Sequence, residues 1–257
     1  MAFRRWFFLG MALTAAVPAV GSARTILAAT PIARTDLPWW RQRHEAKLHE
    51  LAQTNPELIF LGDSITADWE RTGPEKWRDF APVWQRMYGD RRAVNLGFKG
   101  DTTSSLLWRI RNGEVANISP KVAVVLIGAN NMGRPHWSAE DTVAGINEII
   151  DELHKRLPTT KILLLGVLPS DRSPWVTETT QQINHALAKQ FNGDHSVAFL
   201  DLSALFMRSG AVNRDLFLDP KLTPPEPPLH PTAQAQAMMA TAMEPVLANM
   251  LGDRPHS

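Results

Sequence analysis

The segment LIFLGDSIT, residues 58–66, starts with four consecutive apolar residues and then changes to Gly62, Asp63 and Ser64. A short unbroken apolar run is typical of a strand that is buried on both faces of a parallel sheet. The polar residues after it allow two interpretations. Either they form a turn in which Asp63 or Ser64 caps the next helix, or they present a nucleophile at the carboxyl edge of the sheet.

Further apolar runs alternate with helical patterns along the chain. The predicted strands are 58–61, 93–96, 122–127, 161–167 and 197–200. The predicted helices are a first helix entered through Asp36 and Pro38, then 77–87, 103–111, 139–156, 177–190 and 232–250, with a helix cap at Ser138–Asp141. Strands joined by helices imply right-handed crossovers and a parallel sheet. The pattern therefore predicts an α/β fold with a single doubly wound, flavodoxin-like sheet of five parallel strands and helices on both faces.

The composition excludes several classes of protein and site. The 257-residue chain has 27 basic and 26 acidic residues, so no strong electrostatic field indicates a nucleic-acid partner. It has no cysteine, which excludes disulfides, thiolate nucleophiles and cysteine-ligated metal. The eight histidines form no tight cluster with carboxylates in the sequence. We therefore expect no metal site.

The amino terminus has the layout of a secretory signal peptide. Residues 1–23 carry Arg4 and Arg5, then an apolar stretch interrupted by a proline, then a small-residue cleavage site. Twin-arginine export and the general secretion route both fit, and an uncleaved membrane anchor is the alternative. We expect a cleaved signal peptide, a mobile spacer at 24–36 and a domain at 37–252. The mature protein would then be periplasmic or secreted, without stable insertion in a membrane.

Polar residues follow the predicted strands at the edge where such sheets bind ligands. Ser64 follows the first strand, Gly100 the second and Asn130 the third, and His230 precedes the last helix. Acyl transfer requires a serine whose proton is taken by a histidine, together with amide donors for an oxyanion. Taken one at a time, these residues also suit turns and helix caps. Their joint occurrence at four edge positions favours an acyl-transfer site.

The residues around these positions form four ordered blocks. They are FLGDSIT at the serine, NLGFKGDTTSSLLWRI at the glycine, VAVVLIGANN at the asparagine and LHPTAQAQ at the histidine. Together they resemble the SGNH or GDSL hydrolase family, close to the branch of the platelet-activating-factor acetylhydrolase alpha subunits, over about residues 38–250. The resemblance implies that Ser64 is the nucleophile and His230 the general base. It also implies an oxyanion hole formed by the Ser64 amide, Gly100 and Asn130, and no cofactor.

Two positions depart from the family pattern. The family usually carries an aspartate three residues before the histidine, where this chain has Pro227. A proline side chain cannot orient an imidazole, so Glu226 is the favoured substitute, followed by Asp219. A backbone carbonyl that supports a serine–histidine dyad is the third option. At the second position, Lys99 stands where the family more often has glycine or serine, and it either attracts an anionic substrate group or points to solvent.

Aromatic residues and the signal peptide bear on the substrate. Trp137 and Trp175 follow the third and fourth strands, where they either overhang the site or pack their own loops. Indole faces suit sugar rings as well as acyl chains. With Asp63 and Lys99, these two tryptophans are the secondary candidates for substrate contacts. The lack of a long apolar run after residue 23 favours a short acyl group. We expect an exported esterase or transacylase that acts on acetyl esters of a carbohydrate, such as an exported glucan or cellulose.

Two other functions stay open. A lysophospholipase or thioesterase on the same fold would need an apolar groove for a long acyl chain. A degenerate protein that binds polysaccharide or a secretion complex without catalysis would account for Pro227.

Overall fold

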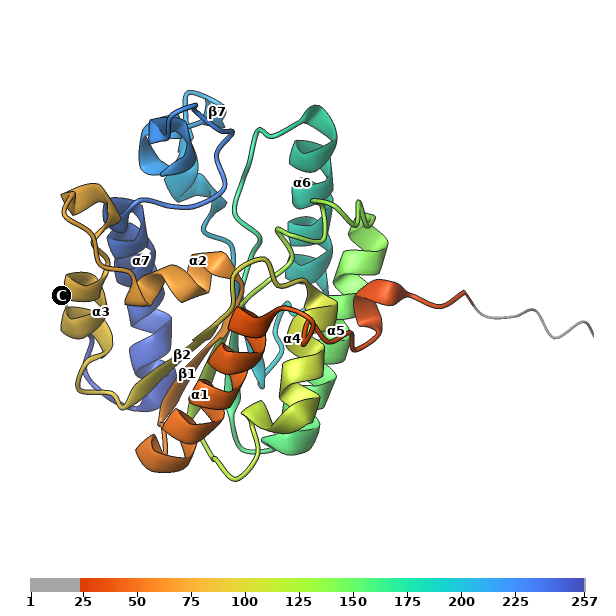
Figure 1. The fold of residues 1–257 in the computed structure, drawn as a ribbon, viewed down its shortest axis with the longest axis vertical. Helices are drawn as coiled ribbons and strands as arrows, with labels where there is room; N and C mark the ends of the chain where they lie inside the picture. Colours follow the sequence, from red (N-terminus) through yellow and green to blue (C-terminus); the bar gives the residue numbers. More distant parts are fainter. Residues whose placement is uncertain (1–23, 257) are drawn as a thin grey trace, which may run out of the picture.

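Five parallel strands form the centre of the molecule, in the order β2-β1-β3-β4-β5 (Figure 1). The computed structural model describes residues 24–256, and the predicted signal peptide at 1–23 lies outside them. The strands are β1 Leu58–Gly62, β2 Ala93–Gly97, β3 Val122–Leu126, β4 Lys161–Leu165 and β5 Val197–Leu200. All neighbouring strands of this sheet pair in parallel. The predicted fold class and five-stranded parallel sheet are therefore confirmed.

Helices connect the strands and cover both faces of the sheet (Figure 1). They are α1 Pro38–Thr54, α2 Ser64–Ala67, α3 Ala81–Tyr88, α4 Thr103–Arg109, α5 Ala139–Arg156, α6 Pro174–Gln190 and α7 Ala233–Leu251. A small hairpin of β6 Met207–Arg208 and β7 Ala211–Val212 precedes α7. Helix α3 begins later than the predicted 77–87, because Pro82 is tolerated only in the first turn of a helix. No helix between residues 24 and 256 has both the length and the apolar character that a membrane span requires.

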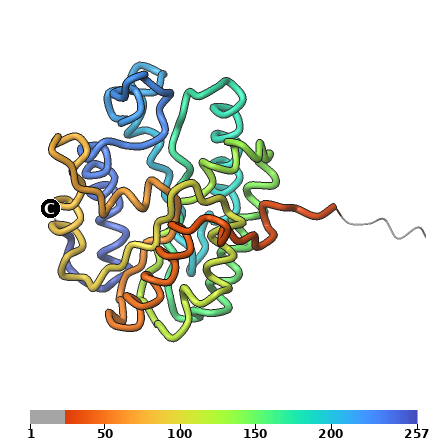
Figure 2. The backbone as a smooth tube through the Cα atoms, viewed as in Figure 1, coloured from red at the N-terminus to blue at the C-terminus, as the bar shows by residue number. Residues whose placement is uncertain are grey.

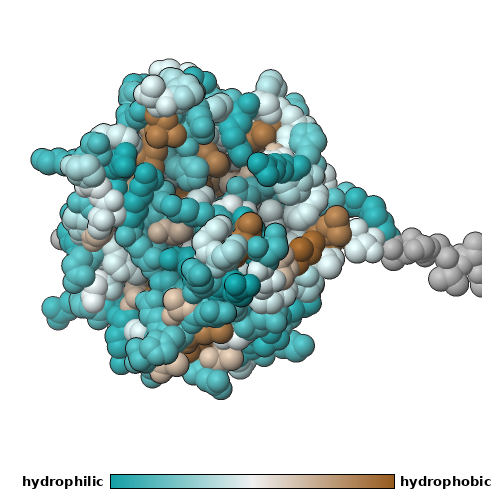
Figure 3. All heavy atoms as spheres, viewed as in Figure 1, coloured by the Kyte–Doolittle hydropathy of each residue, from teal (hydrophilic) through white to brown (hydrophobic). Residues whose placement is uncertain are grey.

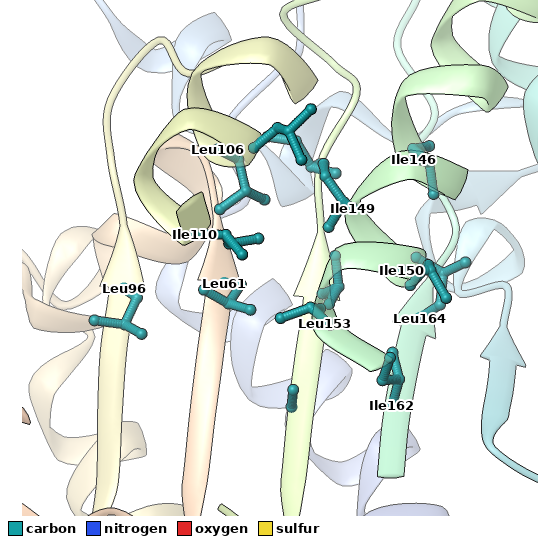
Figure 4. Packing of buried hydrophobic residues seen from close by; sticks show 14 of the residues in the cluster. Leu61, Leu96, Leu106, Ile110, Ile146, Ile149, Ile150, Leu153, Ile162 and Leu164 are labelled. Atoms are coloured by element: carbon teal, nitrogen blue, oxygen red, sulfur yellow. The ribbon is translucent and has the colours of Figure 1, made fainter. Parts of the chain in front are cut away.

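The strands are apolar on both sides because helices pack against each side. In β1, Ile59 and Leu61 pack with residues of α4, α5 and α6. Leu58 and Phe60 alternate with them and pack with residues of α3 and α7. Figure 4 shows the first of these layers, in which Leu106 of α4 and the isoleucines of α5 lie over the strands. Successive strand residues point to opposite faces, so two covered faces require an unbroken apolar run.

Residues 24–36 do not form the mobile spacer that we predicted. A short 3-10 helix in this segment buries Ala28 completely against α4 and α5. The Thr103 hydroxyl donates to the Ala28 carbonyl at 2.7 Å, and the Ile32 N–H donates to the Ser104 carbonyl at 3.1 Å. Figure 2 shows this segment, in red, beside the path of α4 and α5. Hydrogen bonds to α4 hold the segment in place, and its composition alone does not indicate them.

Helix α2 rests on the sheet because β1 and β2 both end in glycine. A Cβ on Gly97 would lie 2.1 Å from the backbone nitrogen of Ala67, and a Cβ on Gly62 would lie 2.2 Å from the Thr66 Oγ1 atom, both in α2. No side chain can approach that closely. Glycine at these two positions therefore lets the short helix that begins with Ser64 sit directly on the carboxyl edge of the sheet.

Candidate active site

Ser64 is the first residue of α2, immediately beyond β1. The Ile65 N–H donates to the Asp63 carboxylate at 2.9 Å, so Asp63 caps this short helix. Both interpretations of the segment at 58–66 thus describe part of the structure, because Asp63 makes the cap and Ser64 presents its hydroxyl. The Ser64 Oγ lies 2.9 Å from Nε2 of His230, which is 166 positions further along the chain. Two distant segments therefore meet within hydrogen-bond distance.

Asp219 holds the other side of the His230 ring. Nδ1 of His230 donates to Asp219 Oδ1 at 2.6 Å. The other carboxylate oxygen accepts the backbone N–H groups of Leu229 at 2.7 Å and of His230 at 2.6 Å. Because an ionised carboxylate only accepts hydrogen bonds, the proton lies on Nδ1. Nε2 then carries the lone pair and faces the Ser64 hydroxyl, as a general base must.

The structure reverses the predicted order of the two carboxylate candidates. The N–H of the residue before Asp219 donates to the His230 carbonyl at 2.7 Å, and Phe217 pairs with Pro231 in an antiparallel bridge. These backbone contacts bring Asp219 beside the imidazole. Glu226 has an exposed side chain, and only its backbone N–H takes part here, donating to the Asp219 carbonyl at 3.0 Å. Proximity in sequence favoured Glu226, but the path of the loop favours Asp219.

The charges of Asp219 and His230 stabilise each other. Burial by itself lowers the pKa of His230, but the hydrogen bond to Asp219 and the charge of Asp219 outweigh it and raise that pKa above 6.5. Burial likewise favours the neutral form of Asp219. Hydrogen bonds from the His230 ring and from two backbone N–H groups nevertheless hold the pKa of Asp219 below 3.8. The site therefore favours an imidazolium beside a carboxylate, the state that forms once the histidine has taken the serine proton.

Gly100 and Asn130 lie in the loops after β2 and β3. Gly100 has a φ of +73°, which residues with side chains disfavour, and its N–H has no acceptor among residues 24–256. The Asn130 side-chain amide donates to the Asp101 carbonyl at 3.0 Å and lies 3.4 Å from the Asp63 carboxylate. Both donors thus lie at the edge that carries the nucleophile. Their roles in an oxyanion hole stay predictions, and this placement supports them.

A buried ionic network, which no sequence pattern indicated, supports the loop after β2. Asp101 is fully buried and accepts hydrogen bonds from Arg34 at 2.9 Å, from Trp40 Nε1 at 2.8 Å and from Arg109 at 2.8 Å. Arg34 also donates to the Lys99 carbonyl at 2.8 Å. Arg34, in the amino-terminal segment, therefore stabilises the loop that carries Gly100, a predicted oxyanion donor. In the sequence, the only hint of this network is Asp101, the acidic residue that directly follows Gly100 in NLGFKGD.

Asp63 is a buried carboxylate next to the nucleophile. Burial raises the pKa of Asp63 from 3.8 to about 7, although the Ile65 N–H and the charge of His230 act in the opposite direction. The residue is 1% exposed and caps α2, which makes it a structural group rather than the substrate contact that we predicted.

Arg172, in the loop after β4, is a partly buried charge close to the site. Its guanidinium donates to the Ala129 carbonyl at 3.0 Å and to the Ser170 hydroxyl at 3.1 Å. Burial lowers the pKa of Arg172, while the charges of Asp63 and Asp219 oppose that shift. Arg172 therefore ties the loop after β4 to the residue before the predicted oxyanion asparagine. Arg172 follows the end of β4, and this position in the sequence could have indicated that it lies near the site.

The nucleophile faces a hollow of about 250 Å³. Ser64 and His230 lie in its wall together with Lys99, Asp68 and Glu226. Lys99 thus borders the space next to the nucleophile, as one of its two sequence interpretations required. Seven of the ten residues in its wall are polar, and Trp77, Leu218 and Leu222 add apolar surface. Within residues 24–256, no group of three or more histidine, aspartate or glutamate side chains could hold a metal ion.

Trp137 and Trp175, for which the sequence left open either an overhang of the site or packing within their own loops, do not line the hollow. The Trp175 ring packs against His136, with ring centroids 3.7 Å apart, and neither Trp175 nor Trp137 lines the hollow. Trp77 supplies the indole in that wall instead. The segment before α3 reaches the site, whereas the loops after β3 and β4 keep their aromatic rings outside the hollow.

The matches with known proteins agree with this arrangement. The sequence pattern of the GDSL-like lipase/acylhydrolase family matches residues 60–238. Platelet-activating factor acetylhydrolase IB subunit alpha2 of Gallus gallus is 29% identical over 233 residues, which cover 89% of this chain and 93% of that protein. Subunit alpha2 of Homo sapiens is 31% identical over 196 residues, which cover 74% and 80% of the two chains.

The fold is also found in solved structures of distant sequence. A carbohydrate acetylesterase family member from Sinorhizobium meliloti superposes with a TM-score of 0.57 at 18% identity, covering 77% of this chain and 99% of that one. At this identity the likeness concerns the fold alone. The span that the family pattern matches contains the serine, both predicted oxyanion donors, Asp219 and His230, and the chain belongs to the GDSL-like lipase/acylhydrolase family.

Proposed function

We propose that this protein is an exported serine esterase that removes or transfers short acyl groups, acetyl above all, on a polysaccharide such as an exported glucan or cellulose. One observation carries the chemistry. The Ser64 hydroxyl, the His230 ring and the Asp219 carboxylate form a hydrogen-bonded chain with distances of 2.9 Å and 2.6 Å. Membership of an acylhydrolase family supports the hydrolysis of carboxylic esters.

The first half-reaction follows from this geometry. Nε2 of His230 takes the Ser64 proton while Oγ attacks the ester carbonyl carbon. The carbonyl oxygen becomes an oxyanion, for which the Ser64 N–H, the Gly100 N–H and the Asn130 amide are the proposed donors. The intermediate then collapses, the bond from the carbonyl carbon to the alcohol oxygen breaks, and the alcohol leaves with the proton from the imidazolium. Asp219 keeps the ring oriented throughout, and the product on the enzyme is acetyl-serine.

The second half-reaction decides between hydrolysis and transfer. Water or a sugar hydroxyl attacks the acetyl carbonyl while His230 takes its proton. The bond to Ser64 Oγ breaks and the imidazolium returns the proton to that oxygen. Water yields acetate, and a sugar hydroxyl yields a new acetyl ester. Incubation with 4-nitrophenyl acetate and an unacetylated glucan oligosaccharide, followed by mass spectrometry, distinguishes the two products.

Three observations support an acetylated carbohydrate as the substrate. The hollow beside Ser64 is small, at about 250 Å³, and seven of the ten residues in its wall are polar. The fold is similar to that of a protein described as a carbohydrate acetylesterase family member. The amino-terminal sequence indicates export, which would bring the protein to extracellular polymers.

A lysophospholipase or thioesterase function is the second candidate. The names of the relatives, platelet-activating factor acetylhydrolases, favour a lipid-derived ester. An apolar hollow of about 400 Å³ lies between α6 and the small hairpin, with Met207 and Val212 in its wall, but neither Ser64 nor His230 lines it. A series of 4-nitrophenyl esters separates the candidates. A maximum of kcat/KM at acetate supports the proposal, and a maximum at eight carbons or more supports the lipase.

Fluorophosphonate labelling tests whether the protein is an enzyme. We expect the wild type to be labelled and Ser64→Ala to remain unlabelled, with turnover abolished in Ser64→Ala and in His230→Ala. An unlabelled wild type would favour the non-catalytic alternative, a polysaccharide-binding or secretion-associated protein.

Export has its own test. Cell fractionation and amino-terminal sequencing of the mature protein are expected to find it in the periplasm or medium, beginning at Arg24. A full-length chain in the membrane fraction would contradict this part of the proposal.

A further inference from the structure

The hollow beside the nucleophile shares wall residues with two others. A hollow of about 470 Å³ shares Asp68, Arg71 and Lys99 with it, and Trp39 lies in the wall of this larger hollow. A hollow of about 330 Å³ shares Trp77 with it. The hollow that contains Ser64 is thus linked through its wall to both of the others. A single small ester would fill the hollow beside Ser64 only.

The charges in the larger hollow are largely paired within the protein. Arg43 donates to Glu70 at 2.9 Å, and Arg71 lies 3.6 Å from Asp68. Paired charges exert a weak net field, so this hollow selects neither a strongly anionic nor a strongly cationic chain. They still offer many hydrogen-bond donors and acceptors to hydroxyl groups.

The aromatic surface in the two outer hollows comes from one indole in each. Trp39 is 42% exposed at the start of α1, and only Ala67 adds a further apolar side chain to that wall. Trp77 is the aromatic residue in the wall of the hollow of about 330 Å³. A long acyl chain would need a more continuous apolar lining. Figure 3 shows one face of the molecule, on which hydrophilic atoms predominate and hydrophobic atoms form separate patches.

An isolated flat ring among hydrogen-bonding groups suits a pyranose, which has an apolar ring face and hydroxyl groups at its rim. We propose that the three hollows form one extended groove that binds several consecutive sugars of a polymer, with Trp39 and Trp77 stacking on sugars on either side of the acetylated one. This inference rests on the proposed esterase function, and it names the length of substrate that the site recognises and the residues that recognise it.

The test compares substrates of different length. The measured quantity is kcat/KM per acetyl group on partially O-acetylated cello-oligosaccharides of one, two, four and six glucose units, divided by kcat/KM on 4-nitrophenyl acetate. We expect this ratio to rise about tenfold from the monomer to the hexamer in the wild type, because each outer sugar adds a stacking contact. Trp39→Ala is expected to reduce the rise about three- to tenfold, and Trp39→Phe to retain most of it.

Trp77 needs a folding check, because it packs against the buried Phe80 and Leu218. Trp77→Ala is therefore compared only if its circular dichroism and melting curve match the wild type, and the exposed Trp39 carries the test otherwise. Trp137→Ala is the matched control, since this indole lies outside all three hollows and its removal is expected to leave the length dependence unchanged.

The possible results of this experiment test the extended groove and the esterase activity separately. Equal ratios at every length, with normal hydrolysis of 4-nitrophenyl acetate, would overturn the groove and leave the esterase standing. A loss of length dependence in Trp137→Ala but not in Trp39→Ala would overturn the assignment of these residues. No turnover of any ester by the wild type would overturn the proposed function, and this inference with it.

Discussion

The carboxylate of Asp219 lies 2.6 Å from Nδ1 of His230, which is eleven residues further along the chain. Its second oxygen accepts two backbone N–H groups at 2.7 Å and 2.6 Å, so both oxygens are fixed. Pro227, three residues before the histidine, has no side-chain group that could orient the ring. A short antiparallel contact between Phe217 and Pro231 brings in the substitute carboxylate. The groups needed to orient the imidazole are therefore present, although they come from a different part of the loop.

Replacing Asp219 is expected to impair catalysis far more than replacing Glu226. Asp219→Asn loses the acceptor that keeps the proton on Nδ1, and a wrong tautomer lowers kcat by about three to four orders of magnitude. Glu226→Gln leaves the histidine contacts intact and is expected to change kcat about twofold at most. Steady-state kinetics on 4-nitrophenyl acetate measures both. Equal losses in the two variants would contradict the assignment of Asp219.

The pH dependence of kcat/KM reports the same contact. Only neutral His230 accepts the serine proton, so activity is lost as the pH falls through the pKa of this group. Because Asp219 raises that pKa, the acid limb of the wild-type profile is expected above pH 6.5. Asp219→Asn removes this charge, so the acid limb of its remaining activity is expected at lower pH. In Glu226→Gln the acid limb is expected at the wild-type pH. An acid limb at the same pH in both variants would rule out the ion pair as the cause.

Asp63 is expected to make the folded state less stable as the pH rises. Its pKa is about 7 in the folded protein and near 3.8 when unfolded, so the unfolded chain releases this proton first. Between these values the free energy of unfolding falls by about 1.4 kcal/mol per pH unit for this one group. Asn at this position still accepts the Ile65 N–H but cannot ionise.

Urea unfolding of the wild type and Asp63→Asn at pH 5 and pH 8 measures the effect. The stability of the variant relative to the wild type is expected to increase between the two pH values. Asp151→Asn is the matched control, because that side chain is exposed on α5 and forms no ion pair among residues 24–256, so its replacement should leave the pH profile unchanged. Parallel profiles for the wild type and Asp63→Asn would refute a buried neutral carboxyl group.

Arg34 is expected to act on turnover through the loop that carries Gly100. It donates to the Lys99 carbonyl at 2.8 Å and to Asp101 at 2.9 Å, and its guanidinium lies about 3.3 Å from where a Cβ of Gly100 would be. Arg34→Ala frees this loop, and the misplaced donor should lower kcat on 4-nitrophenyl acetate about tenfold with little change in KM.

Arg41→Ala is the control for Arg34→Ala. Arg41 is exposed, and its guanidinium makes only a 3.4 Å contact with the Thr35 carbonyl among the described residues. Its replacement is expected to leave kcat near the wild-type value. Melting temperatures of both variants show whether stability changes as well. Indistinguishable kcat values would mean that the amino-terminal segment does not position the loop.

Local sequence predicted most of the architecture. The strand at 197–200 and the helix at 139–156 have the predicted bounds, and Ser138 caps that helix by accepting the Asp141 N–H at 3.1 Å. Such features depend on residues within one or two turns of each other, so the sequence carries them directly. The packed segment at 24–36 was missed because its partners, Thr103 and Ser104, lie about seventy residues away.

The sequence by itself determined the parallel sheet, the edge at which its polar loops gather, and the serine, glycine, asparagine and histidine placed there, because the parallel direction of the strands and the position of the loops follow from the alternation of apolar runs and helices. Only the tertiary structure decided which carboxylate faces His230, which indoles border the nucleophile, and that Arg34 and Arg172 support the neighbouring loops. These outcomes depend on how irregular loops fold against one another. No periodic pattern encodes the path of such a loop, and contacts between residues far apart in the chain determine it.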